Sequence, residues 1–228
     1  METVQRGNRT PATMFLQVLL NKAGASPPLV PDGIFGPNTH DAAVAFQAAN
    51  GIGPANGVVN AVTWMRLGAG LEKKHPVRLF GQPNSTTCWS AASTMMHGTN
   101  QSVGSGQSTM VSGGGLDTEV NNVEGFVRAN GWQLINRQSA PAVEALIGGL
   151  ARSPLWIAFQ LHHAEHAVIF SGVYSHRDRS ADATVFIVHD PWPPGQGSIY
   201  GTPYTRREVV LRSVRARPRA IIQYVAGR

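Results

Sequence analysis

Residues Gln82–Met96 read QPNSTTCWSAASTMM and contain Cys88, the only cysteine in the chain. Beyond it, apolar residues recur at the three- and four-residue spacing of a helix face, which predicts a helix that begins at Cys88. A thiol at a helix start lies beside backbone N–H groups and the positive end of the helix dipole, and both favour the nucleophilic thiolate. We expect the hydroxyls of Ser85, Thr86 and Thr87 to cap this helix.

Three polar residues elsewhere fit a nucleophilic cysteine. The side-chain amide of Gln82 can donate to a developing oxyanion, and His166 and Asp190, far downstream, can serve as base and orienting carboxylate. A lone cysteine is also commonly a buried small apolar residue. On the cysteine alone, that alternative stays open.

These residues stand in the order of a known family. The pattern runs Gln82, then Cys88-Trp89-Ser90-Ala91-Ala92, then His166-Ala167-Val168-Ile169, then His189-Asp190-Pro191-Trp192. It resembles the papain-like cysteine peptidases of bacteria, including the bacteriocin-processing branch, over about residues 76–228. The resemblance implies that the cysteine attacks, the histidine moves the proton, the aspartate orients the imidazole, and the glutamine helps to form the oxyanion hole. We also expect Trp89 and Trp192 to contact the substrate.

The first 70 residues predict a small all-α module of three helices. Two loops repeat one pattern, in which Asp32-Gly33 and Asn56-Gly57 each precede a threonine and a helix. The residues that carry a family resemblance are Leu16-Gln17, Asp32-Gly33, Phe35-Gly36, Thr39, Phe46-Gln47, Gly57-Val58-Val59 and Thr63-Trp64. They resemble the peptidoglycan-binding domain of many wall hydrolases, which implies peptidoglycan as a partner. We expect the aromatic residues in the core, leave Gln17 and Gln47 open as surface positions, and place ligand contacts on exposed polar loop residues.

The chain therefore predicts a peptidoglycan-binding domain over 1–70, a linker over 71–78 and a cysteine peptidase domain over 79–228. In the second domain, periodicity predicts helices within 116–130 and 140–152, and strands over 155–161, 167–174, 185–189 and 220–225. Helices followed by strands indicate an α+β domain. The resemblance implies two lobes, one helical and one an antiparallel sheet. We interpret the glycine- and serine-rich run at 98–115 as a loop, and hypothesise a flap beside the substrate.

Composition narrows the partners. The net charge is +6 and the pI about 10.1, which suits an anionic polymer such as the cell wall. The basic residues near the end of the chain are Arg206, Arg207, Arg212, Arg215, Arg217 and Arg219. Solvated surface positions would explain them equally, and without interleaved aromatic residues we expect no nucleic acid partner. No apolar run suggests a membrane span, and the polar start does not resemble a signal peptide.

A zinc site is the rival interpretation of one cluster. His162, His163 and His166 surround Glu165, and zinc amidases often accompany wall-binding modules. The flanking residues favour strands, so the cluster is predicted to be a strand, a turn and a strand, where helical ligand spacing does not apply. We therefore expect no metal and no cofactor.

Together these features predict a cysteine hydrolase that cleaves an amide bond in peptidoglycan. We expect an exported antibacterial effector or a lysin that acts in the periplasm or cell wall after specialised secretion or lysis. An effector implies a cognate immunity protein. The alternatives are a papain-like protease that acts on proteins and uses the first domain for docking, the zinc amidase, and a wall-binding protein without activity.

Overall fold

The structure is a computed structural model that describes residues 1–98, 115–116, 120–136, 141–161, 164–204 and 222–226. The chain divides into two compact units. Unit 1 comprises Met1–Lys73, Val173–Ile187 and Tyr200–Thr205, and unit 2 comprises Lys74–Gly172, Val188–Ile199 and Arg206–Arg228. The first module therefore shares its unit with two later segments of the chain.

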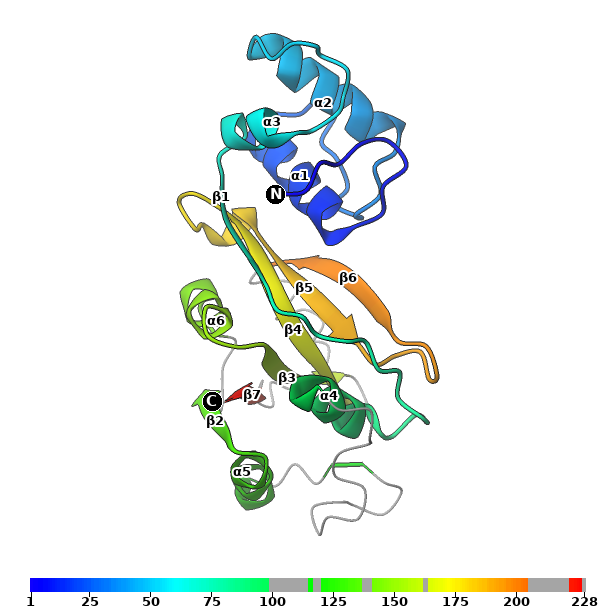
Figure 1. The fold of residues 1–228 in the computed structure, drawn as a ribbon, viewed down its shortest axis with the longest axis vertical. Helices are drawn as coiled ribbons and strands as arrows, with labels where there is room; N and C mark the ends of the chain where they lie inside the picture. The colour runs from blue at the N-terminus through cyan, green and yellow to red at the C-terminus, as the bar shows by residue number, and fades with distance from the viewer. Residues whose placement is uncertain (99–114, 117–119, 137–140, 162–163, 205–221, 227–228) are drawn as a thin grey trace. The chain divides into compact units, whose positions relative to one another are not determined.

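Unit 1 opens with the three expected helices, α1 (Pro11–Lys22), α2 (Pro37–Ala49) and α3 (Ala61–Arg66) (Figure 1). A proline occupies the first turn of α1 and of α2, where its missing N–H costs no helical hydrogen bond. The side chains of Thr10 and Asn60 cap α1 and α3 by accepting backbone N–H bonds. These caps set where the helices begin.

Two buried glutamines hold the repeated loops. The Oε1 atom of Gln17 accepts the N–H of Gly33 at 2.9 Å, and its Nε2 atom donates to the carbonyl of the next residue at 3.0 Å. Gln47 repeats both bonds with Gly57 and the residue after it, each at 2.9 Å. Each glutamine also donates at 3.1 Å to a threonine in the first turn of the following helix. The alternative that Gln17 and Gln47 are surface positions is therefore wrong, because both side chains are buried beneath the loops that they bind.

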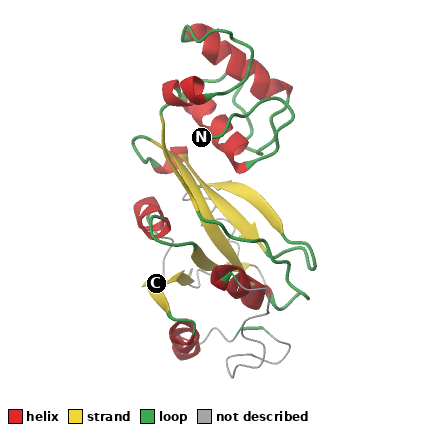
Figure 2. Cartoon of the chain, viewed as in Figure 1, coloured by secondary structure: helices red, strands yellow, loops and turns green. Residues whose placement is uncertain are grey.

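Within the described residues, seven strands form one sheet in the order β2-β7-β3-β4-β5-β6, with β1 paired to β4 (Figure 2). The strands are β1 (Ala69–Lys74), β2 (Trp132–Asn136), β3 (Leu155–Leu161), β4 (Ala164–His176), β5 (Thr184–Asp190), β6 (Ser198–Pro203) and β7 (Ile222–Ala226). Four of them match predicted strands. The sequence did not predict β2 or β6, and β1 occupies residues 71–74 of the expected linker.

The core of unit 1 joins the helices to the strands. Phe35 and Trp64 are buried as expected, and Phe46 is partly buried against the same cluster. Phe15 of α1 stacks on Trp64 and on Tyr174 of β4, with ring centroids 5.9 and 5.6 Å apart. Residues of β5 complete the cluster. The three-helix module and the ends of these strands therefore share one hydrophobic core.

Unit 2 contains α4 (Cys88–His97), α5 (Val120–Ala129) and α6 (Val143–Leu150). Its core is aromatic: Phe126 of α5 lies 5.6 to 5.8 Å, centroid to centroid, from Trp89, Trp132 and Trp156. These residues belong to α4, β2 and β3, so one cluster packs α4 and α5 against the sheet. With helices followed by an antiparallel sheet, the predicted α+β class is confirmed.

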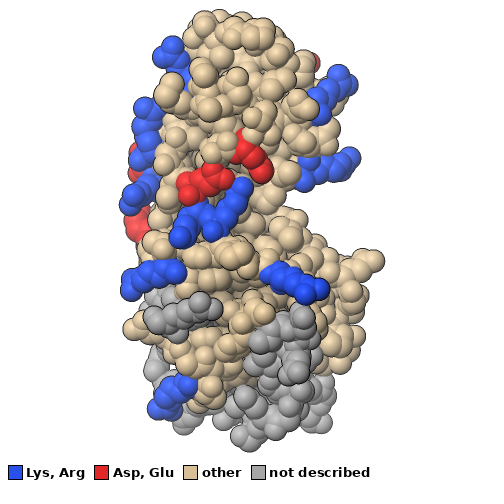
Figure 3. All heavy atoms as spheres, viewed as in Figure 1, with Lys and Arg blue, Asp and Glu red and all other residues tan. Residues whose placement is uncertain are grey.

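Basic side chains are dispersed on the face of the molecule that Figure 3 draws. Figure 3 shows Lys and Arg spread over the visible face rather than gathered in one patch. The arginine-rich segment near the end of the chain lies outside the described residues. In the parts that the structure describes, no helix is long and apolar enough to cross a bilayer.

Candidate active site

Cys88 is the first residue of α4, as the sequence predicts. Its side chain is 7% exposed and lies in the unit 2 core, on the same helix face as Ala92 and Met95. The predicted hydroxyl cap is wrong for Thr87, the residue before the helix. Its Oγ1 atom donates to the backbone carbonyl of Asn84 at 3.3 Å instead. The start of α4 is thus built by a turn at 84–87, and the dipole of the helix points its positive end at the thiol.

His166 lies near the start of β4, and Asp190 is the last residue of the neighbouring strand β5. The Nε2 atom of His166 and Oδ1 of Asp190 are 2.7 Å apart. Both side chains are largely buried, with exposures of 17% and 14%. Cys88 forms a second side-chain hydrogen bond with His166.

The electrostatics of the three side chains favour a charged imidazole. Burial on its own lowers the pKa of His166, because it penalises the cation. Hydrogen bonds and charge interactions with Asp190 and Cys88 outweigh that cost and raise the pKa from 6.5 to about 9. His166 is therefore protonated at neutral pH, which is the state that a histidine paired with a thiolate must hold.

Gln82 lies six positions before the thiol, in the segment that leads to α4. Its side chain is 1% exposed, and its Nε2 atom donates to the carbonyl of Asn84 at 2.5 Å. That contact fixes the orientation of the amide, since Oε1 would repel another carbonyl oxygen. The amide keeps a second N–H for a further acceptor. Gln82 also accepts the N–H of Gly195 and donates its own N–H to the carbonyl of Pro191, both at 2.9 Å.

A family model described as papain-like cysteine protease AvrRpt2 matches residues 72–201, more than half of the chain. The chain belongs to the papain-like cysteine proteases. A second model, for a peptidoglycan-binding domain, matches residues 9–67. The predicted order of the two domains and the prediction of a cysteine peptidase are therefore confirmed. Within the papain-like proteases, the matching family model is the one described by the name AvrRpt2.

Gly81 sets how closely two segments of the protease approach each other. A Cβ atom on Gly81 would lie 2.5 Å from the backbone nitrogen of Gln196 and 2.8 Å from the carbonyl carbon of Gly195. Only glycine fits so close to backbone. The turn after Asp190 is consequently packed against the segment that carries Gln82. The sequence offered no signal for this contact beyond a glycine before the glutamine.

The two tryptophans differ in their surroundings. Trp89 is 2% exposed and packs edge-on against Phe126, so the prediction that it contacts substrate is corrected: its side chain belongs to the core. Trp192 is 49% exposed, and its backbone N–H donates to Oδ1 of Asp190 at 2.8 Å. Its side chain is therefore open to solvent beside the contact between His166 and Asp190, and a substrate contact stays a prediction for Trp192.

His189 is a buried residue of the protease that sequence reasoning left without a role. It is 7% exposed, and its Nδ1 atom has no hydrogen-bond partner among the described residues. Burial lowers its pKa, with a smaller opposing effect from the backbone of Val77. His189 is therefore neutral at neutral pH. It ties the strand that ends in Asp190 to the segment that leads to Gln82.

The zinc interpretation uses a helical pair of His162 and His166, and His166 lies in strand β4. Strands β3 and β4 pair antiparallel, with Leu161 opposite Ala164 and Phe159 opposite His166. His162 and His163 lie outside the described residues, as do residues 99–114 of the predicted flap. His166 is engaged by a carboxylate and a thiol, an arrangement that suits proton transfer.

Proposed function

We propose that this cysteine protease hydrolyses an amide bond in peptidoglycan: in the stem peptide, in a cross-bridge, or at the junction of muramic acid and peptide. The observation that carries the proposal is the pairing, in one chain, of the Cys88–His166–Asp190 contacts with a domain matched to peptidoglycan binding. The match supports wall binding, and the contacts support acyl transfer through a thiol.

In the first step, the Cys88 thiolate forms a bond to the amide carbon. The C–N bond then breaks as the His166 imidazolium gives its proton to the leaving nitrogen. The raised pKa of His166, about 9, supports this role because the proton is present at neutral pH. Asp190 holds the ring through Nε2 and stabilises its positive charge.

In the second step, water attacks the thioester. Its oxygen bonds to the acyl carbon while His166 accepts a proton, and the C–S bond breaks to restore the thiolate. The negative oxygen formed in each step needs hydrogen-bond donors. We assign this role to the backbone N–H of Cys88 and to the second N–H of the Gln82 amide. The buried, fixed position of Gln82 supports that assignment, since preorganised donors stabilise an oxyanion best.

We further propose that the enzyme acts in the periplasm or cell wall as an antibacterial effector or a lysin. An effector of this kind needs a cognate immunity protein in the cell that makes it. The test is expression directed to the periplasm of a bacterial host. Wild type should lyse the cells and Cys88→Ala should not, and survival of the wild-type culture would contradict a toxic role.

A protein substrate is the second candidate. The matched family is described as a protease, which favours polypeptide cleavage with the first domain used for docking. Purified sacculi and a denatured protein separate the two proposals. Each substrate is incubated with four samples: wild type, Cys88→Ala, alkylated enzyme and chelator-treated enzyme. Release of wall fragments by wild type and chelator-treated enzyme alone supports the proposed function; cleavage of the protein with intact sacculi supports the second candidate.

A further inference from the structure

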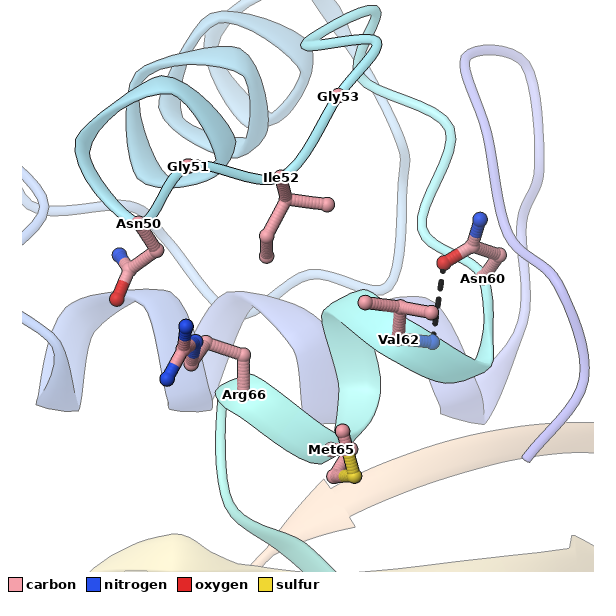
Figure 4. Close-up of a pocket in the computed structure, with 8 residues that line it drawn as sticks. All are labelled: Asn50, Gly51, Ile52, Gly53, Asn60, Val62, Met65 and Arg66. Carbon is pink, nitrogen blue, oxygen red and sulfur yellow. Dashed lines mark hydrogen bonds between the residues drawn. The ribbon is translucent and has the colours of Figure 1, made fainter.

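A pocket of about 440 Å³ lies in the three-helix module, between α3 and the loop that follows α2. That volume falls in the range of about 300–1,000 Å³ typical of small-ligand sites. Its lining residues are Asn50, Gly51, Ile52, Gly53, Asn60, Val62, Met65 and Arg66. Figure 4 shows Ile52 reaching from the loop into the space above α3, with Asn50 and Arg66 together at one end. This pocket is separate from the residues assigned to catalysis.

The apolar lining is exposed. Val62 and Met65 on α3 are 52% and 69% exposed, and both line the pocket together with Ile52. Large apolar side chains at such exposures are few in the described chain, and two of them meet here. An apolar surface gathered around polar groups is typical of a binding site.

The polar lining has a defined set of donors and acceptors. Asn50 uses Nδ2 to bind the carbonyl of Phe46, which leaves Oδ1 as an acceptor. Asn60 uses Oδ1 to accept the N–H of Val62, which leaves Nδ2 as a donor. A peptide group needs one acceptor and one donor, so the two carboxamides match it.

Charge selects the end group of the ligand. Arg66 is the one charged residue in the lining, and it forms no ion pair with any residue that the structure describes. A guanidinium binds a carboxylate through two parallel hydrogen bonds, and no acidic side chain lines this pocket to compete for it. The lining also lacks an aromatic ring on which a sugar could stack. These features favour a small peptide with a free carboxylate over a sugar chain.

We propose that this pocket binds the stem peptide of peptidoglycan, with a peptide carboxylate on Arg66 and alanine methyl groups against Ile52, Val62 and Met65. The proposal rests on the proposed function, because it takes the wall as the partner of the module. It adds that the module recognises the peptide of the wall and not its glycan.

The test measures binding to the full chain carrying Cys88→Ala, which keeps the ligand intact. The probes are a free stem tetrapeptide, titrated by calorimetry, and glycan strands stripped of peptide, used as competitors. Two variants change the pocket, Arg66→Gln and Val62→Glu. Their matched controls are Arg6→Gln and Val30→Glu, at exposed positions of the same module outside the lining. Melting temperatures verify that each variant is folded.

We expect both pocket variants to weaken tetrapeptide binding by about tenfold or more. Arg66→Gln removes the guanidinium that pairs with the peptide carboxylate, and Val62→Glu places a negative charge near that carboxylate. The controls should bind as the parent does, and stripped glycan should not compete. Equal affinity in Arg66→Gln and Arg6→Gln, or competition by stripped glycan, would overturn the proposal. Hydrolysis of sacculi by wild type is measured in parallel. If the sacculi are hydrolysed but the pocket variants bind the tetrapeptide as the parent does, the pocket proposal is wrong and the proposed function stands.

Discussion

The Nε2 atom of His166 lies 2.7 Å from Oδ1 of Asp190, although 24 positions separate the two residues in the chain. The contact exists because β4 and β5 are neighbours in the sheet. Asp190 is the last residue of β5, and it lies beside His166 near the start of β4. The same carboxylate oxygen accepts the backbone N–H of Trp192 at 2.8 Å. Two donors thus hold the carboxylate that orients the imidazole.

Two substitutions of Asp190 distinguish the effect of its negative charge from the effect of its hydrogen bond to His166. We expect Asp190→Ala to lower kcat by on the order of 10²-fold, since it removes both the orientation and the charge that stabilise the imidazolium. Asp190→Asn keeps an acceptor and should lose less. The measurement is kcat on a defined muropeptide for the two variants. Equal loss in both would mean that the hydrogen bond to the ring contributes nothing.

The raised pKa of His166 predicts the alkaline limit of activity. A pKa of about 9 means that the imidazolium persists below that value and loses its proton as the pH rises through it. Because the leaving amine takes that proton, kcat/KM should fall above about pH 9. In Asp190→Asn, burial still lowers the pKa of His166 and the charge of Asp190 no longer raises it, so the limit should move to lower pH. An unchanged alkaline limit in Asp190→Asn would contradict the assignment of that limit to His166.

Gly81 should be a positioning residue. In Gly81→Ala, the new Cβ atom would meet backbone of Gly195 and Gln196 within 3 Å, so the loop after Asp190 must move. We expect kcat to fall by roughly 10- to 100-fold with little change in melting temperature, since small displacements in a catalytic constellation are costly. The control is Gly148→Ala in α6, where a Cβ atom would meet nothing within 4 Å. Matching activities for the two variants would show that the close approach has no catalytic consequence.

The shared core of unit 1 predicts that the first module cannot be removed without harm. Deleting residues 1–67 would uncover Tyr174, Val185 and Ile187, which pack in one cluster with the helices. Each such side chain contributes about 1.5–3 kcal/mol when buried. We therefore expect the shortened chain to melt at lower temperature, to bind a hydrophobic dye, and to lose activity even on soluble peptides. A fragment that melts and reacts like the full chain would indicate a separable module.

Much of the fold follows from periodicity. The three helices of the module and strands β3, β4 and β5 have regular apolar patterns and were predicted. The missed strands lack such a pattern for physical reasons. Strand β1 reads AGLEKK and alternates half-buried with exposed residues, which resembles a charged linker until its pairing with β4 is known. Strand β6 lies at the edge of the sheet and contains a glycine and a proline, which edges tolerate and sequence rules penalise.

The site was predictable where chemistry leaves a local signature. Cys88 at a helix start and His166 at the head of an apolar run have such signatures. Trp89 has no such signature, because a tryptophan next to a nucleophile can face either the substrate or the core. In this structure its ring is buried and packs against Phe126. The backbone bonds of Gln82 to Pro191 and Gly195 join segments remote in sequence and carry no side-chain signal. Such contacts become visible only in three dimensions.

We expect the sulfur of Cys88 to attack an amide carbon of peptidoglycan. The most direct measurement is the mass of the enzyme after a reaction with a disaccharide-peptide is quenched in acid, followed by mapping of the modified residue. We expect a transient thioester on Cys88 whose added mass equals the acyl part of the muropeptide, and no such adduct in Cys88→Ala. Continued hydrolysis of the muropeptide by Cys88→Ala, or an adduct on a different residue, would contradict it.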